Sequence, residues 1–141
     1  MGDEYDLSRF LTAQDELYET ALRELVQGEK ESCWMWFVFP QLKGLGRSST
    51  SEFYGIADAS EALAYYEHPV LGARLIECCE AILEHEDKSA LEIFGGIDCQ
   101  KLRSCATLFE RCTGDFIFYQ VLEQFFDSRR DESTLRLLGE A

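Results

Sequence analysis

Apolar side chains recur at intervals of three and four residues through most of this sequence, which is the spacing of one face of an α-helix. The clearest stretch begins near Ser8 and ends before Gly28, a residue suited to the left-handed turn that closes a helix. Capping boxes at Asp58 and Ser89 mark two further helix starts. Because no pair of segments alternates apolar and polar residues, the sequence predicts an all-α fold of about eight short helices.

The length of 141 residues suits a single domain spanning 1–141, and no linker or repeat divides it. The six cysteines include no C-x-x-C pair, so we expect reduced thiols and neither a metal site nor a cofactor. The acidic N-terminus does not resemble a signal peptide, and no apolar run reaches the roughly 18 residues of a membrane span. These features predict a cytoplasmic protein that does not enter membranes.

The formal net charge of −14 argues against binding to nucleic acids or anionic membranes, since phosphates would be repelled. The charge is unevenly distributed. Residues 1–31 carry nine acids against three bases, residues 58–97 carry nine against two, but residues 32–57 carry only Glu52 against Lys43 and Arg47. A surface helix would be charged, so the segment 32–57 is predicted to be buried or to line a pocket.

That segment contains a glycine- and serine-rich loop after Pro40. The run Gly44–Ser49 lacks the third glycine of a dinucleotide fingerprint and follows no strand, which excludes a Rossmann site. Its backbone N–H groups, together with Lys43 or Arg47, could hold one anion. The alternative is an ordinary connection with serine caps.

Trp34 and Trp36 lie two positions apart, so on a helix they point to nearly opposite sides. Both rings could be core residues, or one of them could form the wall of a pocket for a planar ligand. His68, directly before Pro69, could cap a helix or act as an acid–base residue. No established catalytic motif is present.

Taken together, several motifs resemble one bacterial family, the domain-of-unknown-function family eighteen-ten. They are Tyr5-Asp6-Leu7-x-Arg9-Phe10, Trp34-Met35-Trp36-Phe37-x-Phe39-Pro40-Gln41-x-x-Gly44-Leu45-Gly46, Tyr54-Gly55-Ile56, His68-Pro69, Ile93-Phe94-Gly95 and Lys101-Leu102-x-Ser104. The resemblance covers nearly the whole chain and implies an all-α single domain with no known reaction. The family often carries the label "calpastatin", but that calpain inhibitor is long, repetitive and disordered, unlike this chain.

The resemblance also raises two points about chemistry. The family usually has histidine where this chain has Cys33, so any acid–base role there is altered or absent; the thiol could instead act as a nucleophile or simply pack. A fainter similarity in size and helical character links the chain to NADAR-type proteins, which process ADP-ribose-linked substrates.

Two functions are therefore predicted as alternatives. The first is a pocket that binds or processes a small anionic, nucleotide-like ligand, with an ADP-ribose-related compound as one possibility. The second is an acidic protein-interaction module in which the Trp-Met-Trp-Phe block is purely structural. Residues 34–54 and the turn Lys101–Thr107 are expected to line the pocket. Its predicted ligand-binding residues are Arg9, Gln14, Trp34, Gln41, Ser48, Tyr54, Lys101 and Thr107, with His68 and Cys33 as candidate catalytic residues.

Overall fold

Short connections join a series of helices through residues 4–139, the part of the chain that the computed structural model describes. The predicted all-α fold is confirmed, and within these residues the helices number nine. An isolated parallel bridge between Leu42 and Ile56 adds a single β-type contact. The helices are α1 (Ser8–Gln27), α2 (Met35–Val38), α3 (Ser49–Tyr54), α4 (Ala59–Glu67), α5 (Leu71–Leu83), α6 (Ala90–Phe94), α7 (Gly96–Thr113), α8 (Phe116–Phe126) and α9 (Glu132–Leu137).

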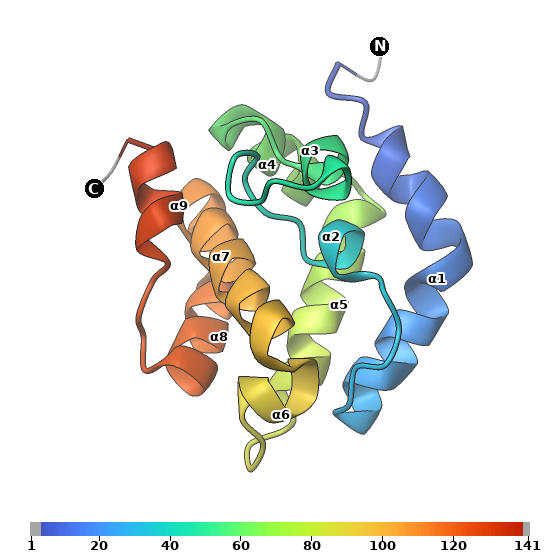
Figure 1. Ribbon diagram of the computed structural model, residues 1–141, viewed down its shortest axis with the longest axis vertical. Coiled ribbons are helices and arrows are strands. Elements are labelled where there is room, and N and C mark those ends of the chain that lie inside the picture. The colour runs from blue at the N-terminus through green and yellow to red at the C-terminus, as the bar shows by residue number, and fades with distance from the viewer. Residues whose placement is uncertain (1–3, 140–141) are drawn as a thin grey trace.

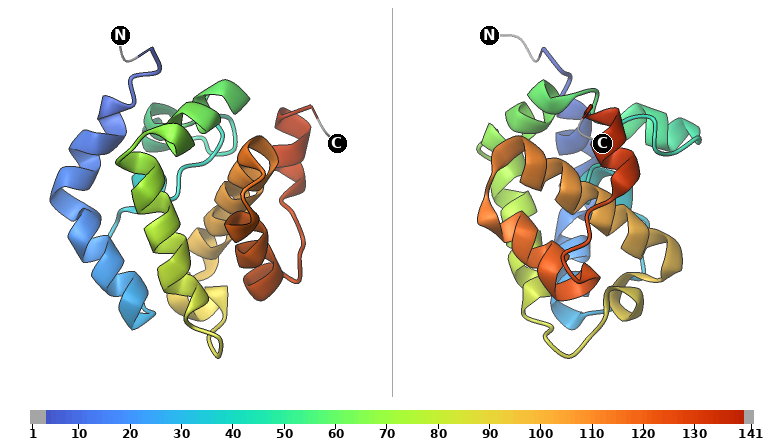
Figure 2. Two further views of the ribbon diagram at one scale, coloured as in Figure 1. Left: turned by 180° about the vertical axis from the view of Figure 1, so that it is seen from behind. Right: turned by 90° about the vertical axis from the view of Figure 1, so that its left-hand side faces the viewer.

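Two long helices, α5 and α7, organise the packing. α7 contacts α4, α6, α8 and α9, and Figure 1 shows it crossing the middle of the molecule. α5 contacts α1, α4 and α8, and seen from behind it lies between α1 and the α7–α8 pair (Figure 2). The largest fully buried side chains come from many of these elements and form one aromatic-rich core: Trp34, Tyr65, Phe10, Phe39, Phe109 and Phe118.

The helix ends follow the sequence signals closely. The side chains of Asp58 and Ser89 cap α4 and α6, and α6 has the complete capping box. Gly28 ends α1 with a positive φ of 82°, a conformation that glycine adopts without steric cost. The short helix predicted before Pro40 is α2, which ends at Val38.

A buried carboxylate holds the segment that leads from α1 to α2. Glu24 lies on the inner face of α1 and is 4% exposed. Its carboxylate accepts hydrogen bonds from the backbone N–H of Glu31 (2.9 Å) and Ser32 (3.0 Å), the Ser32 hydroxyl (2.6 Å) and the Trp34 indole N–H (2.8 Å). These bonds fix the course of residues 31–34, and therefore the place where α2 begins.

The hydrogen bonds also determine the charge state of Glu24. Burial alone would raise the pKa of its carboxyl group, but the bonds from Ser32, Glu31 and Trp34 outweigh it and lower the pKa from 4.5 to about 2. Because the folded-state pKa is depressed, the resulting stabilisation is fully present above about pH 4.5 and is lost as the pH falls towards 2.

We predict that Glu24→Gln lowers the free energy of unfolding at pH 7 by about 2–3 kcal/mol, because an amide replaces a charged acceptor of four hydrogen bonds. The difference from the wild type should shrink as the pH falls from 4.5 towards 2, where the wild type loses the same contribution. Urea unfolding at several pH values measures both effects. The exposed Glu16 on the same helix gives the matched control, Glu16→Gln. Equal pH dependence in wild type and Glu24→Gln would contradict the assignment.

Candidate functional site

Two neighbouring cavities lie between the α2 segment and the first turns of α7, and both are lined by Trp36 and Lys101. The inner cavity, of about 310 Å³, is lined by Lys30, Cys33, Trp34, Met35, Trp36, Phe37, Thr50, Asp98 and Lys101. The outer cavity, of about 460 Å³, is lined by Trp36, Gln41, Leu45, Gly46, Arg47, Ser48, Ile97, Gln100, Lys101, Ser104, Asp131 and Ser133. We call the two together the cleft.

Trp34, the N-cap of α2, and Trp36, within α2, lie in different surroundings. Trp34 is fully buried and donates its indole N–H to Glu24, whereas Trp36 remains partly exposed. The Lys101 ammonium lies 4.2 Å from the centre of the Trp36 ring, a cation–π contact between α2 and α7. Of the two tryptophans, Trp36 is the one that lines both cavities.

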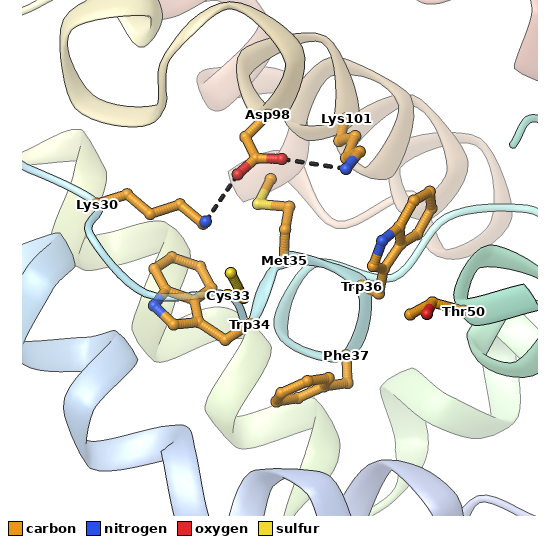
Figure 3. Close-up of a pocket in the computed structure, with 9 residues that line it drawn as sticks. All are labelled: Lys30, Cys33, Trp34, Met35, Trp36, Phe37, Thr50, Asp98 and Lys101. Carbon is orange, nitrogen blue, oxygen red and sulfur yellow. Dashed lines mark ion pairs between the residues drawn. The ribbon is translucent and has the colours of Figure 1, made fainter. Parts of the chain in front are cut away.

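Three charged groups on the lining of the inner cavity are joined by ion pairs. Asp98 Oδ2 lies 2.7 Å from Lys30 Nζ and Oδ1 lies 3.2 Å from Lys101 Nζ, and Figure 3 shows the two lysines on either side of the carboxylate. Burial alone would raise the pKa of Asp98, but the two lysines lower it below its ordinary value. Asp98 is therefore ionised at neutral pH, and it is shared by both ammonium groups.

The outer cavity contains an unsatisfied buried amide. Gln41 is 5% exposed, and its backbone is fixed by a hydrogen bond of 2.8 Å from Ile56 N to its carbonyl oxygen. Its side-chain Nε2 is buried without a hydrogen-bond partner among the described residues. Leaving such a donor unsatisfied costs about 1–3 kcal/mol. The unsatisfied donor therefore destabilises the folded protein, and the side chain that carries it lines a cavity.

The two cations that line the outer cavity, Lys101 and Arg47, differ in whether they form an ion pair. Lys101 is paired with Asp98, but no acidic side chain of the described residues pairs with Arg47, which is exposed beside Ser48. Asp131, at the N-cap of α9, provides a carboxylate on the same cavity and already accepts from Thr134 N and Oγ1. The cavity therefore combines an unpaired guanidinium, an ammonium, a buried amide donor and one carboxylate.

Several residues predicted for the ligand site do come together. Gln41, Ser48 and Lys101 line the outer cavity, and Trp34, Cys33 and Lys101 line the inner one. The exposed thiol of Cys33 lies next to the buried Trp34 in Figure 3. Lys43 or Arg47 was expected to help the loop after Pro40 to hold an anion. Arg47 lines the outer cavity, and Lys43 lines neither cavity.

Other predicted site residues lie outside the cleft and have structural roles. The Arg9 guanidinium donates to the carbonyl groups of Phe53 and Gly55 and pairs with Glu61 at 2.8 Å, which ties the end of α3 to α1 and α4. Gln14 is buried and donates to Phe37 O at 2.7 Å and to Tyr65 Oη at 3.1 Å. Polar residues within apolar stripes suggest a pocket, and in the structure Arg9 and Gln14 form hydrogen bonds to backbone and core groups.

Tyr54, Thr107 and His68 also lie outside the linings of the two cavities. The Tyr54 ring packs against Phe10 and Phe37. Thr107 is fully buried and its hydroxyl accepts from Asp131 N at 2.8 Å, so it positions the start of α9 rather than lining the cavity. His68 Nδ1 accepts from the N–H groups of Val70 (3.1 Å) and Leu71 (3.2 Å), which is the capping alternative.

Four important residues were missed by sequence reasoning. Lys30, Asp98 and Asp131 sit near helix ends, where a charged residue is usually solvated, so only the fold brings them to the cleft. Glu24 did carry a signal, because it lies three residues after the buried Ala21 and next to the buried Leu25 on the apolar face of α1. A carboxylate in that position needs partners.

Within residues 4–139, no set of three or more histidine, cysteine, aspartate or glutamate side chains is placed to hold a metal ion. No disulfide joins the cysteines of this part of the chain. In the same residues, no helix is both long enough and apolar enough to span a membrane.

Comparison with known proteins agrees with the resemblance in the sequence. The family described as "Protein of unknown function (DUF1810)" matches residues 4–138. The crystal structure of the conserved hypothetical protein Rv1873 from Mycobacterium tuberculosis superposes with a TM-score of 0.96 at 43% sequence identity, covering 97% of this chain and 99% of that one. No curated protein matches, and a relation to NADAR-type proteins is not shown. On this evidence the chain belongs to the DUF1810 family.

Proposed function

We propose that this protein binds a small anionic, nucleotide-like ligand in the cleft. The observation that carries the proposal is the buried Nε2 donor of Gln41, which has no partner within the described protein and belongs to a side chain that lines the outer cavity. A ligand oxygen would supply the missing acceptor and remove the cost of burying that donor.

The surroundings of Gln41 favour an anion as the source of that oxygen. In a chain of net charge −14, the outer cavity brings Arg47 and Lys101 together, with Asp131 as the acidic group on its lining. A second buried donor without a partner, Arg103 Nε, belongs to a side chain that contacts two lining residues, Gln100 at 3.0 Å and Asp131 at 4.0 Å. One unsatisfied donor thus belongs to a lining residue and a second to a side chain that contacts the lining, and the lining is more positive than the protein as a whole.

The size and shape of the cleft suit such a ligand. Cavities that bind small molecules generally measure about 300–1,000 Å³ and combine apolar walls with a few polar groups. The two cavities, of about 310 and 460 Å³, fall in this range, and Trp36 lines both of them. Ribose 5-phosphate and ADP-ribose are therefore suitable probes, the first for the anionic group alone and the second for the ADP-ribose-related class.

A second candidate function, interaction with a basic protein, has one specific observation in its favour. A groove between α5 and α8 combines the acidic Glu80 and Glu84 with Ile76, Leu83 and a Phe116 side chain that is 63% exposed. An arginine-containing apolar peptide that binds the wild type but not the double variant Glu80→Lys/Glu84→Lys would support this function. If the peptide does not bind the wild type, interaction with a basic protein through this groove is contradicted, and the cleft is the functional site.

We predict that Gln41→Leu stabilises the protein without ligand, by up to about 1–3 kcal/mol, because it removes an unsatisfied buried donor while keeping the side-chain volume. The same change should abolish the thermal stabilisation that ribose 5-phosphate produces in the wild type. Thermal unfolding with and without the sugar phosphate measures both effects. A variant that is strongly destabilised and still binds would show that Gln41 is a packing residue.

We further predict that Arg47→Gln weakens the binding of ribose 5-phosphate and ADP-ribose at least about tenfold, because it removes the unpaired cation of the outer cavity. Lys43→Gln is the matched control, since Lys43 is an exposed cation of the same loop that lines neither cavity. Isothermal titration calorimetry at fixed ionic strength gives the affinities. Equal losses in the two variants would indicate a general charge effect and contradict a site at Arg47.

A further inference from the structure

The two cavities of the cleft have different chemistry. The inner lining includes the apolar and aromatic side chains of Trp34, Met35, Trp36 and Phe37, whereas eight of the twelve residues that line the outer cavity are polar, Gln41 and Arg47 among them. A ligand that occupies both cavities must therefore have an apolar part and a polar part.

The ion pairs indicate which cavity takes the negative charge. In the inner cavity, the ammonium groups of Lys30 and Lys101 both lie within 3.2 Å of Asp98, so each of them already has a carboxylate partner. In the outer cavity, Arg47 has no acidic partner among the described residues and Gln41 Nε2 has no acceptor. An anion gains more in the outer cavity, because there it meets donors that nothing else satisfies.

The inner cavity suits a planar ring. Trp36 and Phe37 provide aromatic surface on its lining, and Thr50 lies on the far side of Trp36 from Lys101 in Figure 3. Lys101 borders both cavities, so it lies where the two parts of one ligand would join. Aromatic walls favour planar rings through apolar contact and stacking geometry.

We propose that the ligand is a phosphomonoester that carries a planar ring, with the phosphate in the outer cavity and the ring in the inner cavity. This inference rests on the proposed function and adds the class of ligand and its orientation. The phosphate meets Arg47, Gln41 Nε2 and Lys101, and the ring lies against Trp36 and Phe37 beside the Cys33 thiol.

The test compares AMP, which has both parts, with ribose 5-phosphate, which lacks the ring. AMP is expected to bind about tenfold more tightly. AMP should also slow the alkylation of Cys33 by iodoacetamide, whereas ribose 5-phosphate should not, because only the ring reaches the inner cavity. Peptide mass spectrometry resolves Cys33 from Cys112, which lies near the other end of α7 and reports any general change in accessibility.

A variant that fills the inner cavity gives an independent measurement. Cys33→Trp places a large ring at an exposed position on that lining and should bring the ratio of the two affinities to about one. Thr50→Trp serves the same purpose from α3 if the first variant does not fold. Thr12→Trp, on the exposed face of α1, is the control for a bulky substitution and should keep the ratio near ten.

The outcomes separate the two proposals. If ribose 5-phosphate binds but AMP binds no more tightly and does not protect Cys33, the ring site is wrong and the proposed function stands. A preference for AMP that survives Cys33→Trp and Thr50→Trp also overturns the ring site. If neither compound binds, the proposed function fails and the ring site fails with it.

Discussion

The hydrogen bonds to the buried carboxylate of Glu24 are the interactions on which the rest of the site depends. Four donors from residues 31–34 converge on it, and its pKa of about 2 keeps it charged at neutral pH. These bonds hold Trp34 in the core as the residue that begins α2. With Trp34 fixed, the short helix presents the ring of Trp36 to α7, where Lys101 covers it at 4.2 Å.

The same arrangement explains why the cleft differs from the rest of an acidic molecule. Residues 32–57 carry almost no charge, and Arg47 is the base of that segment that lines the cleft. The other two basic groups come from outside the segment, Lys30 from before α2 and Lys101 from α7. Elsewhere, buried polar side chains such as Gln14 and Glu61 have close partners. The buried Nε2 of Gln41 differs from them because it has no partner among the described residues, and its side chain lines a cavity. Binding sites commonly retain such groups because their partner is the ligand.

Much of the fold was predictable because its signals are local. Caps at Asp58 and Ser89 and the closing turn at Gly28 depend on a few neighbouring residues. Gln41 and Ser48 were predicted as pocket residues from the low charge of residues 32–57, and Lys101 from the separate turn Lys101–Thr107. The roles of Arg9, Gln14 and Thr107 were not predicted, because each is decided by a partner 23 or more residues away. Polarity alone does not tell whether a buried group bonds to the protein or to a ligand.

The side-chain amide resonance of Gln41 tests the central claim most directly. In a ¹H–¹⁵N correlation spectrum, its NH₂ pair is identified by its loss in Gln41→Leu, and ribose 5-phosphate is then titrated into the wild type. We expect this pair and the Trp36 indole N–H to shift with one saturating dissociation constant, because the Nε2 donor gains an acceptor beside that ring. A Gln41 pair that stays unchanged at saturation, while other resonances shift, would place the ligand elsewhere and contradict the account.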